Sequence, residues 1–168
     1  MLLSPRLTAR LATSLCALAA FAALAIALLW QHGDRALLPC PLCILQRYAY
    51  LGLGASAVLA AVFVHRRRIG LTLSALGLLF ALAGVIVAAR NVWVEQHPGL
   101  SCGIDALEVF VNGLPTAQWW PQLFYAEGVC GGKLLPILGL TIPQWSLAGL
   151  IALVLVFGVA IWAQRRVD

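Results

Sequence analysis

Charged side chains are scarce in this chain of 168 residues: they make up 10% of it, whereas 62% of the residues are hydrophobic. In a soluble domain about a quarter of the residues are charged and about half are apolar. The shortage of charge therefore excludes an ordinary soluble protein and places the chain in a membrane. Internal repeats and low-complexity tracts are also absent, apart from an abundance of alanine and leucine, so we expect one integral membrane domain over residues 1–168.

Charge is missing altogether from long segments of the chain. Crossing about 30 Å of hydrocarbon takes about 20 helical residues. We expect four membrane-spanning helices, in which Arg47 is the only charged residue, at about 11–30, 44–64, 69–89 and 146–163. The first exceeds the roughly 7 to 15 apolar residues of a signal peptide, so we interpret it as an uncleaved span. The predicted fold class is all-α, a polytopic membrane protein with a bundle of four transmembrane helices.

Most cations lie in the two tails and in the short connection between the second and third spans. They are Arg6, Arg10, Arg66, Arg67, Arg68, Arg165 and Arg166. By the positive-inside rule these segments are cytoplasmic. The loops at about 31–43 and 90–145 then face outward, which in a bacterial inner membrane means the periplasm. The net charge of +5 arises from these topology signals, so it does not indicate a nucleic-acid partner.

The second outer loop contains an aromatic and apolar segment, LPTAQWWPQLF, at residues 114–124. Tryptophan is typical of the boundary between membrane and water, and an amphipathic helix there lies in the plane of the bilayer. We expect a short interfacial helix in this loop and no fifth span. In the alternative interpretation, the tryptophans fill the core of a small folded loop.

Cysteine is nearly absent from the spans, where only Cys16 occurs, and we expect it to pack as a small apolar side chain. The other four are Cys40, Cys43, Cys102 and Cys130, all in the outer loops. Thiols on the oxidising side of a membrane form disulfides, and four cysteines allow three pairings. Their spacing favours Cys40 with Cys43 and Cys102 with Cys130.

The two pairs differ in what a disulfide would contribute. A bond between Cys102 and Cys130 would close a long loop, so a structural role is a natural interpretation of that pair. A bond between Cys40 and Cys43 removes little chain entropy, which favours a bond that is made and broken in a reaction. Structural zinc sites usually take two closely spaced ligand pairs, so we expect no metal.

The sequence PCPLC at residues 39–43 indicates how the close pair is presented. Proline suits the first position of a helix, so Pro41 predicts that Cys40 is the N-cap and that Cys43 lies in the first turn. The positive end of the helix dipole favours thiolate over thiol. We therefore expect both sulfurs to be stabilised as thiolates.

Arg47 follows Cys43 by four residues, so the two share one face of the helix. An arginine at a membrane boundary often extends to the lipid headgroups. Beside a redox pair, however, its guanidinium suits a quinone, whose oxygen it would bind while electrons arrive. Arg90 and His97, near the outer end of the third span, are further candidates for the quinone site.

Together these motifs resemble the bacterial disulfide bond formation protein B family. The resemblance rests on PCPLC with Arg47, on Cys102 and Cys130 in a long second loop, on LPTAQWWPQLF before GVC, and on IPQW before the last span. It covers nearly the whole chain. It implies an inner-membrane enzyme that reoxidises a periplasmic thioredoxin-like dithiol oxidase of the A type and passes the electrons to the membrane quinone pool, as ubiquinone or menaquinone.

The resemblance also implies a role for each cysteine. Cys102 would form a mixed disulfide with the partner, Cys130 would pass electrons to Cys40, and Cys43 would face the quinone as a thiolate stabilised by Arg47. Two alternatives remain open. One is an enzyme similar to vitamin K epoxide reductase, running in the reducing direction, and the other is a structural membrane protein whose disulfides only staple its outer loops.

Overall fold

Four long helices form the body of the computed structural model, which describes residues 4–32, 38–97, 104–128 and 137–166. They are α1 (Pro5–His32), α2 (Pro41–Val62), α3 (Arg67–Gln96) and α7 (Ile142–Arg165), and each is long and apolar enough to cross a membrane. Three short helices, α4 (Ile104–Asn112), α5 (Pro115–Trp119) and α6 (Pro121–Phe124), lie between α3 and α7 in the chain. The described residues contain no strand beyond one isolated bridge between Ile137 and Leu140. The prediction of an all-α, four-span membrane protein is confirmed.

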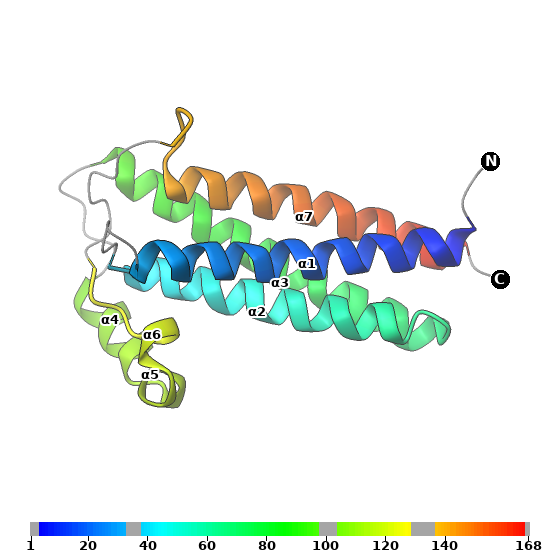
Figure 1. Cartoon of the computed structure of the whole chain (residues 1–168), viewed down its shortest axis with the longest axis horizontal. Coiled ribbons are helices and arrows are strands. Elements are labelled where there is room, and N and C mark those ends of the chain that lie inside the picture. Colours follow the sequence, from blue (N-terminus) through cyan, green and yellow to red (C-terminus); the bar gives the residue numbers. More distant parts are fainter. Residues whose placement is uncertain (1–3, 33–37, 98–103, 129–136, 167–168) are drawn as a thin grey trace.

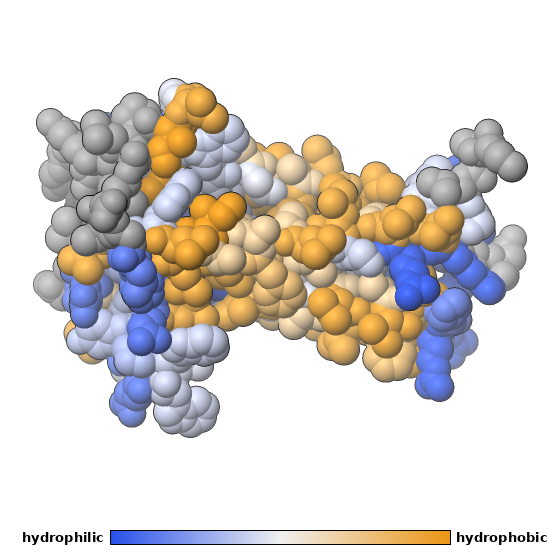
Figure 2. Space-filling model, in the orientation of Figure 1, coloured by the Kyte–Doolittle hydropathy of each residue, from blue (hydrophilic) through white to orange (hydrophobic). Residues whose placement is uncertain are grey.

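The long helices run side by side along the longest axis of the molecule (Figure 1). Neighbours in the bundle are α1 and α2, α2 and α3, α3 and α7, and α7 and α1. The start of α1 and the end of α7 lie at one end, and α4, α5 and α6 lie at the other (Figure 1). Hydrophobic residues cover the middle of the bundle, and hydrophilic residues lie near both ends (Figure 2). This distribution is the one that a bilayer requires of a multi-pass protein.

The helices extend beyond most of the predicted spans. The third begins at Arg67 and continues to Gln96, well past the predicted end at residue 89, whereas the second ends at Val62 instead of residue 64. Apolar composition marks only the part of a helix that lies in hydrocarbon, and the backbone hydrogen bonds continue into the polar boundary. The extra turns of α3 carry Asn91, which is buried.

Small residues on α3 allow the helices to approach closely. Gly77, Ala81, Gly84 and Ala88 are all buried. A Cβ atom at Gly77 would lie 2.5 Å from the ring of Phe157 on α7, which is closer than carbon atoms can pack. The seam between α3 and α7 therefore depends on these small side chains.

The outer loop contains three short helices where the sequence predicts one. Pro115 and Pro121 each occupy the start of a new helix, because proline has no N–H to continue the preceding one. Trp119 and Trp120 are 82% and 55% exposed. The alternative in which tryptophans fill the core of the loop is therefore wrong, and both remain available to a membrane boundary.

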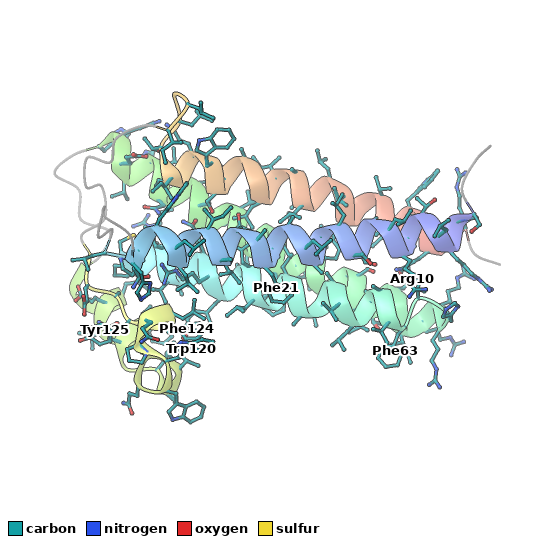
Figure 3. The ribbon with its side chains drawn as sticks, viewed as in Figure 1. Arg10, Phe21, Phe63, Trp120, Phe124 and Tyr125 are labelled. Carbon is teal, nitrogen blue, oxygen red and sulfur yellow. The ribbon has the colours of Figure 1, made fainter. Side chains whose placement is uncertain are left out.

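The loop has a small core of its own, shared with the start of α2. Its buried members are Ile44, Val111, Ala117, Leu123, Phe124 and Ala126. The ring of Phe124 stacks on Tyr48 of α2 at 4.7 Å between centroids, at the end of the bundle opposite Arg10 and Phe63 (Figure 3). Asn112 holds Ala126 through two hydrogen bonds, since its Nδ2 donates to the carbonyl oxygen and its Oδ1 accepts from the backbone N–H. The loop is thus packed against the helix that begins with the cysteine pair.

Candidate functional site

Cys40 and Cys43 meet at the start of α2, in the arrangement that the sequence predicts. Cys40 is the N-cap, Pro41 occupies the first turn, and the Cys43 backbone N–H donates to Cys40 Sγ at 3.3 Å. The two sulfur atoms lie 2.7 Å apart. They are free thiols in this structure, in contact and therefore placed to form a disulfide when they are oxidised.

The two thiols are not equivalent, which corrects one expectation. Hydrogen bonding with the Cys43 side chain, followed by burial, raises the pKa of Cys40. The sequence predicts a stabilised thiolate for both, but of two thiols in hydrogen-bond contact one must keep its proton in order to donate it. The expectation of a stabilised thiolate therefore does not hold for Cys40.

Cys43 has a partner that the sequence prediction missed. The Nδ2 atom of Asn91, on α3, donates to Cys43 Sγ at 3.6 Å, and Asn91 is only 2% exposed. The sequence signal for it is weak, an amide just after the predicted third span, and only the structure shows that this polar side chain is buried and therefore needs a partner.

Arg47 lies one turn after Cys43 and is 7% exposed. Its Nη1 donates to the carbonyl oxygen of Leu123 at 2.8 Å, and its Nη2 donates to Gln31 Oε1 at 2.9 Å. It therefore joins α2 to α6 and to α1. A guanidinium has five N–H donors, so these bonds leave others for a ligand.

A cavity of about 390 Å³ lies among the outer halves of α1, α2, α3 and α7. Its polar wall is one face of α2, with Cys43, Gln46, Arg47 and Tyr50 at helical spacing, completed by Asn91 of α3. The facing walls on α1 and α7 are mostly apolar, and include Ala23, Leu24, Ile26, Ala27, Ile142, Pro143, Trp145 and Gly149. Ile26 and Trp145 are themselves exposed on the bundle surface, so the cavity extends from the dithiol to the lipid-facing side.

The structure does not bring Arg90 and His97 to this cavity. Both are exposed, and neither is among the described residues that line it. The His97 ring instead stacks on Trp93 at 4.7 Å, with its Nδ1 2.8 Å from the Trp93 carbonyl oxygen. Gln46, which lines the cavity, was missed, although it follows Cys43 by three residues and so belongs to the same helical face as Arg47.

Cys102 and Cys130 lie outside the described residues, but the structure describes the chain before Cys130 as far as Gly128. The backbone N–H groups of Glu127 and Gly128 both donate to the carbonyl oxygen of Pro39, at 3.1 and 3.0 Å. Gly128 precedes Cys130 by two residues, and Pro39 directly precedes Cys40. The segment before Cys130 is therefore held beside the segment before Cys40.

A thiol pair at the start of a membrane-spanning helix, with Cys40 buried and Cys43 half-buried in the wall of a mostly apolar cavity, defines a membrane thiol oxidoreductase. Comparison with known proteins agrees with this class. The family described as disulfide bond formation protein DsbB matches residues 9–160, and this chain belongs to that family.

Several curated relatives are similar over most of their length. Disulfide bond formation protein B of Ralstonia nicotianae is 43% identical over 152 residues, which cover 90% of this chain and 93% of the relative. The protein of the same name from Cupriavidus necator is 44% identical over 90% of this chain and 92% of its own. That from Nitrosomonas europaea is 44% identical over 84% of this chain and 86% of its own. Membership in the family supports a multi-pass membrane protein that forms disulfide bonds.

Proposed function

We propose that this protein reoxidises a periplasmic, thioredoxin-like dithiol oxidase of the A type and transfers the electrons to a membrane quinone, ubiquinone or menaquinone. The observation that carries the proposal is the position of Cys43, one member of the thiol pair, in the wall of a cavity that extends toward the lipid. An acceptor dissolved in the bilayer would reach Cys43 by this route. The distribution of cations further supports cytoplasmic termini and periplasmic loops in the bacterial inner membrane.

The residues around the cavity fit a quinone. Gln46 Nε2 is a buried donor without a hydrogen-bond partner among the described residues, and a buried unpaired donor is costly. A quinone carbonyl oxygen would supply an acceptor for Gln46 or for Arg47, and the apolar walls on α1 and α7 would hold an isoprenoid chain. A bound quinone would accept two electrons and two protons as Cys40 and Cys43 form their disulfide.

The protein's own steps are thiol–disulfide exchanges. The partner's thiolate would attack a Cys102–Cys130 disulfide, and the partner's second thiol would complete its oxidation, leaving Cys102 and Cys130 reduced. Cys130 would then attack Cys40, and Cys102 would complete that exchange, leaving Cys40 and Cys43 as thiols. The contact of Gly128 with Pro39 supports this order, because it brings the chain near Cys130 toward Cys40.

The test is a reconstituted reaction followed by quinone absorbance. Purified protein is mixed with the reduced dithiol oxidase and a soluble quinone, and we expect catalytic loss of the quinone band together with oxidation of the partner. Absence of quinone reduction would overturn the proposal. Net reduction of the oxidised partner by added quinol, without the forward reaction, would instead support an enzyme working in the reducing direction.

Replacing Arg47 with Ala is expected to raise the KM for quinone about tenfold or more and to change the KM for the protein partner much less. The reason is the loss of a charged hydrogen bond, worth roughly 1.5–3 kcal/mol, where about 1.4 kcal/mol corresponds to a tenfold change. Steady-state kinetics with each substrate varied in turn measures both constants. Gln31→Leu is the control, because it removes a partner of Arg47 but leaves the guanidinium. Equal increases in both KM values in Arg47→Ala would contradict direct contact with quinone.

A further inference from the structure

Among the described residues, Asn91 donates a hydrogen bond to one sulfur of the pair and not to the other. Its Nδ2 donates to Cys43 Sγ, whereas Cys40 Sγ accepts from the Cys43 backbone N–H and contacts Cys43 Sγ. Asn91 is almost wholly buried on α3, the helix that packs most extensively against α2. A buried amide held by two packed helices keeps its direction while the chemistry at sulfur changes.

A donor at one sulfur matters because disulfide exchange has a leaving group. Exchange proceeds faster when the departing sulfur is better stabilised as a thiolate, and its outcome depends on which sulfur is attacked. A hydrogen bond to an ionised acceptor is stronger than one to a neutral acceptor. The Asn91 amide therefore stabilises the departing Cys43 thiolate more than it stabilises Cys43 in the disulfide.

The chain that leads to Cys130 is held next to Cys40, the other sulfur of the pair. Pro39, next to Cys40, accepts hydrogen bonds from Glu127 and Gly128. Two separate contacts thus favour one direction of exchange. The hydrogen bonds to Pro39 favour attack at Cys40, and the hydrogen bond from Asn91 favours departure of Cys43. These contacts belong to different elements, α3 and the segment after α6, and neither depends on the other.

We propose that Asn91 is a catalytic residue that directs thiol–disulfide exchange to Cys40 by stabilising Cys43 as the leaving thiolate, an inference that rests on the proposed function. In the step, the attacking thiolate forms a new S–S bond with Cys40 Sγ, the Cys40–Cys43 bond breaks, and its electron pair stays on Cys43 Sγ. The proton of the attacking thiol goes to solvent before the attack. The number of disulfides is unchanged by this step, so it needs no oxidant.

The test uses a small thiol in place of the protein partner. Full-length oxidised protein, with Cys102 and Cys130 replaced by serine, is treated briefly with glutathione, trapped with acid and mapped by mass spectrometry. We expect glutathione almost entirely on Cys40 in this background. Adding Asn91→Leu or Asn91→Asp is expected to slow the exchange about tenfold and to divert a measurable share of glutathione to Cys43. Gln96→Leu, which removes an exposed amide from the same helix, should change neither quantity.

A purely structural role for Asn91 would lower thermal stability without redirecting the attack, so melting temperatures of the variants are measured alongside. Unchanged rate and unchanged site of attack in both Asn91 variants would overturn the inference. This outcome is distinguishable from failure of the proposed function. If the proposed function were wrong, the unmodified protein would fail to reduce quinone in the reconstituted reaction, whatever the site of glutathione attack.

Discussion

Cys43→Ser is expected to reduce quinone turnover to the uncatalysed background. Serine retains the size of the side chain but cannot form a disulfide with Cys40, so the protein has no route by which the electrons leave the pair. The contact between the two sulfur atoms at 2.7 Å and the position of Cys43 in the cavity wall are the structural reasons. The measurement is quinone absorbance with the reduced dithiol oxidase as electron donor.

The matched control for this variant is another cysteine of the same chain. Cys16 is fully buried in the core between the helices, and Cys16→Ala should leave turnover close to that of the unmodified protein. A single round of partner oxidation should survive in Cys43→Ser, because the Cys102–Cys130 pair remains. Full turnover in Cys43→Ser would contradict the proposed pathway and would favour disulfides that only staple the loops.

Gly128→Ala is expected to slow partner-dependent quinone reduction by about tenfold to a hundredfold, the range in which small misplacements of reacting groups fall. An added Cβ would collide with the carbonyl oxygen of Leu38 and would lie 2.9 Å from its carbonyl carbon. Both atoms belong to the backbone, so they cannot move aside without displacing the chain before Cys40. The two hydrogen bonds to Pro39 would be lost or lengthened.

A small dithiol separates this effect from damage to the site itself. Dithiothreitol can reduce the Cys40–Cys43 disulfide directly, so quinone reduction driven by it should change little in Gly128→Ala. Gly158→Ala provides the matched control, because a Cβ there meets nothing within 4 Å. If the rates with the protein partner and with dithiothreitol fell together, the contact would serve to shape the Cys40–Cys43 site and not to deliver Cys130.

The spans and the presentation of the cysteine pair could be predicted from the sequence. An uncharged segment of about 20 residues has few alternatives to a membrane helix. Pro41 likewise determines local structure, since a proline at the first helical position leaves the preceding residue as the N-cap. Both inferences depend on short-range constraints within one segment, and the structure agrees with them.

The environment of the pair could not be predicted in the same way. Asn91 and Cys43 are 48 positions apart, and Arg47 meets Leu123 across 76 positions. Arg90 and Asn91 are adjacent in the sequence, but successive helical residues point about 100° apart. That rotation buries Asn91 against Cys43 and leaves Arg90 exposed, and only the packing of α3 against α2 determines which of the two faces inward.

The sequence by itself thus determined the membrane class, the number of spans and the placement of two thiols at the start of a helix, because each follows from local composition or from proline geometry. The tertiary structure decided which groups surround those thiols. It placed the Asn91 amide within hydrogen-bond distance of Cys43 and put Gln46 and Arg47 in the wall of a cavity. It also brought the segment before Cys130 next to Pro39. The physical reason is that helix rotation and helix pairing depend on the packing of distant surfaces against one another.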